Sequence, residues 1–79
     1  MTENNKERSE ATALICAEID YYLAAKNYRV KDLALKMLIS PASLYNKMKN
    51  IENFTYPEFC RLCSILQLDD STKLKLLAA

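Results

Sequence analysis

The sequence predicts an all-α domain of five short helices, and two observations lead to this prediction. Apolar residues recur at helical spacing from about residue 9 onward, and no segment shows the alternation of apolar and polar residues that is typical of a half-buried strand. The chain has 79 residues, which allow one small domain. We place this domain at residues 9–79, after a disordered N-terminal tail at residues 1–8.

The first helix is expected to run from a cap at Ser9 to about Asn27. Its spacing gives two apolar stripes on nearly opposite sides, and only one of them can enter the core. The other stripe must be covered by the C-terminal helix, which we favour, or by another subunit, because a helix that is apolar on two sides is expected to be buried or paired. The core stripe consists of Ile15, Cys16, Ile19, Tyr22 and Leu23, and the second stripe consists of Leu14, Ala17, Tyr21 and Ala24.

The second helix is expected over about residues 30–38, after a short connection. Arg29 and Lys31 lie at its N-terminus, where unpaired backbone N–H groups and the positive end of the helix dipole also attract an anion. Their placement favours contact with a phosphate, and simple solvation of two surface cations is an equally weighted alternative. Leu35 is an apolar residue on the outward side. The inward residues are Val30, Leu33, Ala34, Met37 and Leu38.

The third helix is expected at residues 41–50, directly after a very short turn. Ser40 is a good N-cap because its hydroxyl can accept a hydrogen bond from an early backbone N–H. Pro41 fits the first helical position, where its missing N–H costs nothing. The apolar stripe of this helix consists of Leu44, Met48 and Ile51.

The opposite side of the third helix offers small, amide and cationic groups, which suit the major groove of DNA. There an Asn side chain can pair with adenine, and a Lys side chain can reach guanine or a phosphate. An ordinary solvated helix is the alternative, because amides and lysines are common on surfaces. Base contacts are expected from Ala42, Ser43, Tyr45, Asn46, Lys49 and Asn50, and phosphate contacts from Arg29, Lys31, Ser40 and Lys47.

The fourth helix has the strongest start signal in the chain. Thr55 and Glu58 form a capping box, and Pro57 is tolerated in the first turn. This helix is expected to end near Gln67, and Phe54, in the loop before it, is expected to enter the core. The fourth helix points Phe59, Leu62, Cys63 and Leu66 inward, and a last helix, capped by Asp69, Asp70 or Ser71, continues through Leu74 and Leu77.

Charge is distributed unevenly along the chain, although the net charge is only +1. Residues 21–50 carry six Lys and Arg residues against one acid, Asp32, whereas residues 1–20 and 51–79 are both net negative. The cations therefore concentrate in the segment that holds the third helix. This asymmetry is expected of a surface that binds the phosphates of double-stranded DNA.

The three cysteines, Cys16, Cys60 and Cys63, are an odd number, which argues against a disulfide framework. Cys60 and Cys63 form a C-x-x-C motif, which can mark a zinc or redox site. A zinc site needs further thiolate or imidazole ligands, however, and the chain has no histidine and only one other cysteine. We therefore expect the cysteines to act as small buried hydrophobes, with no metal or other cofactor.

Enzyme activity is not expected. The chain lacks histidine, a glycine-rich phosphate loop and a pair of carboxylates on one inward face. No apolar run approaches the roughly 20 residues that cross a bilayer, so no membrane partner is expected. The N-terminus also lacks the basic and apolar segments of a secretory signal, which favours a cytoplasmic protein.

The stretch over residues 30–49 resembles the helix-turn-helix of the phage repressor and Cro family, also called xenobiotic-response-element-like. The matching features are Leu33 and Ala34 in the first helix of the motif, Ile39 and Ser40 at the turn, and Leu44 in the second helix. The resemblance covers most of residues 12–77. It implies a compact five-helix phage-repressor-like domain of phage or mobile-element type. Such a domain is a transcriptional regulator, commonly a repressor, which inserts its third helix into the major groove as a homodimer on a near-palindromic site.

Two positions depart from this family. The family usually has a left-handed glycine at the turn, and Leu38 occupies that position here, at a cost of about 1–2 kcal/mol unless the turn is rebuilt. The second inward position of the third helix is shifted to Met48, which leaves Lys47 in the usual apolar position. The alternative function is a protein-interaction module on the same scaffold, with a protein partner and weak or no specific DNA binding.

Overall fold

The computed structural model describes residues 10–78, and within this range it is helical with no strand, which confirms the all-α prediction. The N-terminal tail and the Ser9 cap predicted above lie outside the described residues. The elements are α1 (Glu10–Lys26), α2 (Val30–Met37), α3 (Pro41–Lys49), the short 3₁₀ helix η1 (Ile51–Asn53), α4 (Tyr56–Leu66) and α5 (Asp70–Ala78).

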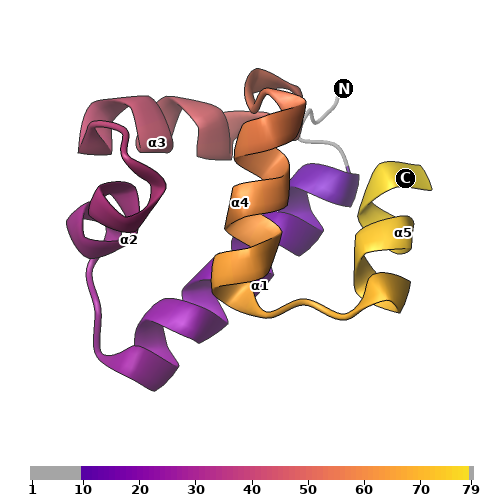
Figure 1. Ribbon diagram of the computed structural model, residues 1–79, viewed down its shortest axis with the longest axis horizontal. Helices are drawn as coiled ribbons and strands as arrows, with labels where there is room; N and C mark the ends of the chain where they lie inside the picture. Colours follow the sequence, from indigo (N-terminus) through magenta and orange to yellow (C-terminus); the bar gives the residue numbers. More distant parts are fainter. Residues whose placement is uncertain (1–9, 79) are drawn as a thin grey trace, which may run out of the picture.

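The helix α1 is the element against which most others pack. It contacts α3, η1, α4 and α5, while α2 packs on α3 and α4. In Figure 1, α4 passes in front of α1, α5 stands at the right, and α3 lies along the top with α2 below it. The core is filled mainly from α1, α2 and α4, with Leu44 from α3, Phe54 from the loop and Leu76 from α5.

The core stripe of α1 is positioned as predicted, since Ile15, Cys16 and Ile19 are buried. The second stripe is not covered by α5, and our favoured expectation for it is wrong. Leu14 is 37% exposed and Tyr21 is 75% exposed. The helix α5 contacts α1 but turns Leu76 into the shared core, so it leaves the second stripe open. Coverage by another subunit stays a prediction.

Three helices end in the same left-handed conformation without a glycine. Asn27, Leu38 and Gln67 have φ values of 58°, 63° and 58° at the ends of α1, α2 and α4. At each end the N–H of this residue and the next N–H donate to carbonyls in the last turn, for example Leu38 to Leu35 and Ile39 to Ala34. This pattern is the Schellman motif.

The structure corrects the expectation that Leu38 points inward. Its side chain is 76% exposed, because the left-handed backbone turns it away from the core. The turn has the left-handed conformation that favours glycine, and it therefore carries the steric cost of a leucine there.

The helix starts follow the capping signals of the sequence. The Ser40 hydroxyl accepts a hydrogen bond from the Ser43 amide at 3.1 Å. Thr55 and Glu58 form the predicted reciprocal capping box. Asp69 is the cap of α5, since its carboxylate accepts from the Thr72 amide at 2.8 Å. The Thr72 hydrogen bonds lower the pKa of Asp69 below its usual value.

Candidate functional site

The outward side of α3 presents a row formed by Ala42, Asn46 and Lys49. All three are exposed, whereas Leu44 is fully buried. At about 100° per residue, the row lies within a sector of about 60° opposite Leu44. Ser43 and Tyr45 are exposed on its two flanks. The helix has nine residues and is thus about 13 Å long, and the diameter of an α-helix with its side chains, about 10–12 Å, is close to the roughly 12 Å width of the major groove.

Two polar contacts from α1 hold the C-terminal end of α3 and the residues after it. The Cys16 thiol donates to the Met48 carbonyl at 3.2 Å. The Thr12 hydroxyl accepts from the Ile51 amide at 2.9 Å. Thr12 is only 1% exposed, so the latter bond lies in a place where water does not compete strongly for either group.

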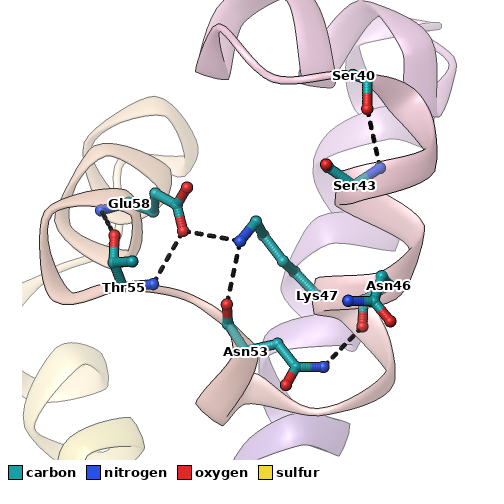
Figure 2. A network of polar contacts seen from close by, with 7 residues as sticks. All are labelled: Ser40, Ser43, Asn46, Lys47, Asn53, Thr55 and Glu58. Carbon is teal, nitrogen blue, oxygen red and sulfur yellow. Dashed lines mark hydrogen bonds and ion pairs between the residues drawn. The ribbon is translucent and has the colours of Figure 1, made fainter.

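Lys47 lies on the flank of α3 that faces the start of α4 (Figure 2). Its ammonium is 3.0 Å from Glu58 Oε1 and donates to the Asn53 carbonyl at 3.1 Å. The Thr55 amide and the Lys47 ammonium both lower the pKa of Glu58. We predicted a phosphate contact for Lys47 from the sequence, but its ammonium is engaged within the chain.

Asn50 also has a local partner that we did not predict. Its side-chain oxygen accepts from the Glu52 amide at 3.0 Å and caps η1. This role explains why η1 starts directly after α3, and it occupies an oxygen that we assigned to base contact. Asn46 is different: its backbone carbonyl accepts from the Asn53 amide side chain at 3.0 Å, while its own side chain is exposed.

The cations at the start of α2 are exposed, as a phosphate contact requires. Arg29 and Lys31 lie on the surface at the N-terminus of α2. The backbone N–H of Arg29 donates to the Asp32 carboxylate at 2.8 Å, so an acid of this chain already partly satisfies the helix end. The sequence contained this signal, since Asp32 is three residues after the cap.

The cysteines differ in exposure from one another. Cys16 and Cys63 are buried, as expected for small hydrophobes, and burial raises the pKa of the Cys63 thiol. Cys60 is exposed, which corrects the expectation for it, because it lies on the outer side of α4. Among residues 10–78, no cluster of three or more Cys, His, Asp or Glu side chains could hold a metal ion.

Two hollows on the surface are lined by residues of these helices. One of about 280 Å³ lies between α1 and α3 and is lined by Asp20, Tyr45 and Lys49, among others. Asp20 therefore moderates the positive potential of Lys49 on that side. The other hollow, of about 540 Å³, contains two lysines and two carboxylates and thus does not favour one charge of ligand. It is lined by Tyr21, Tyr22, Tyr28, Lys26, Lys36, Glu18 and Asp69, among others.

Comparison with known proteins gives no relative from which the role of this site could be inferred. No family model matches the chain, no curated protein matches it, and no solved structure matches it. Within the described residues, none of the helices combines the length and apolar character that crossing a membrane requires.

Proposed function

We propose that this protein is a sequence-specific DNA-binding regulator that inserts α3 into the major groove. The observation that supports this most is the exposed row of Ala42, Asn46 and Lys49 on a short helix whose opposite side is anchored in the core. On this proposal α2, the turn and α3 form a helix-turn-helix of the phage repressor and Cro type. The protein would act as a homodimer, commonly as a repressor.

The side chains of the row have complementary roles in this proposal. Asn46 pairs with the edge of an adenine, and Lys49 donates to guanine or to a phosphate oxygen. The small side chain of Ala42 lets the helix backbone approach the base pairs and contact a thymine methyl group. Ser43 and Tyr45 contribute from the flanks, at the edges of the groove.

Phosphate contacts come from exposed residues at the starts of α2 and α3. Arg29, Lys31 and Ser40 take this role, and Lys47 and Asn50 belong to the framework that holds α3. Two neutralised phosphates, at Arg29 and Lys31, correspond to a slope of about −1.8 for the logarithm of affinity against the logarithm of salt concentration, per subunit, and a phosphate contact of Lys49 makes this slope about −2.7.

The experiment is a titration of labelled duplexes with the full chain over a range of salt concentrations. A library of random duplexes, from which bound sites are selected first, supplies the specific sequence. We expect two half-sites whose centres are about 34 Å apart, and a steep salt dependence. Affinity that is independent of both sequence and salt would contradict the proposal.

A second candidate function, a protein-interaction module, is favoured by one observation. Leu35 and Leu38 are 74% and 76% exposed on α2 and the turn after it. Two exposed leucines so close together are more typical of a surface that binds a protein partner than of a surface that contacts only solvent. If Leu35 and Leu38 form a contact surface, substituting both with Ser should abolish binding of the protein partner and leave DNA binding intact. The DNA proposal alone predicts only that DNA binding is unchanged by these substitutions.

A further inference from the structure

A half-buried ion pair joins α3 to the start of α4. The side chains of Lys47 and Glu58 are only 17% and 27% exposed, and Nζ lies 3.0 Å from Oε1. The same carboxylate oxygen accepts from the Thr55 amide at 2.9 Å, within the capping box of α4. Figure 2 shows that Glu58 thus faces both its own helix end and Lys47.

The pair is reinforced by η1, which lies between the two helices in sequence. The Lys47 ammonium donates to the Asn53 carbonyl, and the Asn53 side chain donates to the Asn46 carbonyl. The end of α3 is therefore linked to the segment before α4 by two further hydrogen bonds. All of these contacts lie on one flank of α3 (Figure 2).

We propose that Lys47 is a positioning residue, which together with Glu58 fixes the rotation of α3 about its own axis. This inference rests on the proposed function, because the rotation of α3 decides which side chains face the base pairs. Leu44 is the one buried residue among the nine of α3, all of which the structure describes. Met48 packs half-buried against the same core, so the apolar side of this short helix is narrow. Contacts on its flank therefore limit how far the helix can roll.

The contacts that hold α3 on one flank and on its buried side come from different helices. Glu58 of α4 holds the flank of Lys47, and Cys16 of α1 holds the Met48 carbonyl on the buried side. Losing the pair would free one flank while leaving Leu44 in place. The helix would still form, but it would open more often, and the Asn46 side chain would no longer be held in one direction.

The decisive variant is Glu58→Gln. Glutamine can keep the capping box, because Gln serves as well as Glu at this position, but it removes the charge that holds Lys47. If Glu58 acted only through its negative charge, its removal would tighten binding to every duplex. A positioning role predicts the opposite for the selected site: about tenfold weaker binding, the size expected for loss of a charge-assisted hydrogen bond, while binding to random duplexes is not weakened. Tighter or unchanged binding to the selected site would overturn the inference.

Variants of Lys47 separate positioning from phosphate contact. Lys47→Met should weaken binding to the selected site and leave the salt slope unchanged, whereas a lost phosphate contact would reduce its magnitude by about 0.9. Lys47→Arg should restore binding, because it keeps the charge near Glu58. The matched control is Glu52→Gln, which removes an exposed carboxylate of η1 and should not weaken binding. A reduced slope in Lys47→Met would overturn the inference.

Hydrogen exchange of the free protein tests the pair independently of DNA. Glu58→Gln and Lys47→Met should speed exchange of the α3 amides more than that of the α2 and α5 amides. If the parent chain binds no duplex, the proposed function fails, and hydrogen exchange alone decides the positioning role. Exchange of α3 at the parent rate in both variants would refute it.

Discussion

The hydroxyl of Thr12 accepts a hydrogen bond from the backbone amide of Ile51 at 2.9 Å, although the two residues are 39 positions apart in the chain. This bond joins the first turn of α1 to the start of η1, directly after α3. Thr12 is a buried polar residue, at 1% exposure. The hydrogen bond thus ties the segment directly after α3 to α1.

Replacing Thr12 with Val should destabilise the protein by about 1–3 kcal/mol. Valine has nearly the same shape but cannot accept the hydrogen bond, so the partly buried Ile51 amide loses this partner. Chemical denaturation gives the free energy of unfolding. The comparison variant is Thr12→Ser, which keeps the hydroxyl and loses about one buried methyl group, worth roughly 0.8 kcal/mol. Equal stability of the Val variant and the parent would show that the bond contributes nothing.

Replacing Leu38 with Gly should stabilise the protein by about 0.5–1 kcal/mol. Glycine relieves the left-handed strain of about 1–2 kcal/mol, and part of this gain is offset by the greater freedom of glycine in the unfolded chain. Little burial is lost, since Leu38 is 76% exposed. Thermal unfolding should therefore show a Tm that is higher by about 2–8 °C.

Leu35→Gly is the matched control for this substitution. Leu35 is 74% exposed, almost the same as Leu38, but it lies within α2 in the ordinary helical conformation. Glycine there should destabilise the protein by about 0.8 kcal/mol. If both variants lower the Tm, the left-handed leucine is not a source of strain.

Helix starts and the core of this protein could be predicted from the sequence because they depend on neighbouring residues. The caps at Ser40 and Thr55 and the buried position of Leu44 follow from spacing alone, and the structure contains them. Leu38 could not be placed correctly by helical periodicity, because the helix ends one residue before it. The glycine-free turn was identified only through the family resemblance.

The parts that the sequence did not predict depend on tertiary contacts. The pairing of Lys47 with Glu58 requires η1 to bring α4 back against α3, and no local spacing encodes this. The exposure of Tyr21 depends on the side of α1 on which α5 packs. The role of Asn50 depends on a 3₁₀ turn that was expected only as a loop.

Acid should destabilise the protein below about pH 4. The pKa values of Glu58 and Asp69 are lowered in the folded state, by the Thr55 amide and then Lys47 for Glu58, and by Thr72 for Asp69. Because the pKa of each carboxyl is lower in the folded state, the unfolded state binds protons first as pH falls. The stability that the two ionised carboxylates contribute is therefore present above the ordinary carboxyl pKa of about 4 and is lost as pH falls through their folded pKa values. Urea denaturation at pH 7 and pH 3 measures the loss. The double variant Glu58→Gln and Asp69→Asn should show a smaller difference between the two pH values than the parent does.

Asn46 and Lys49 should have different effects on DNA binding. Asn46→Ala should cost about 1–3 kcal/mol at one base step and relax the sequence preference there. Lys49→Gln should weaken binding to all duplexes and reduce the magnitude of the salt slope by about 0.9 if Lys49 contacts a phosphate. Fluorescence anisotropy with matched and mismatched duplexes measures both effects. Two variants that bind like the parent would show that the row on α3 is not the contact surface.

The most direct test of DNA recognition by α3 is the selection of bound sites from random duplexes, with the parent chain and Asn46→Ala side by side. The account predicts an enriched sequence with two half-sites about 34 Å apart for the parent. It also predicts that Asn46→Ala loses the preference for adenine at one position of each half-site. No enrichment with the parent, or the same enriched sequence with both proteins, would contradict it.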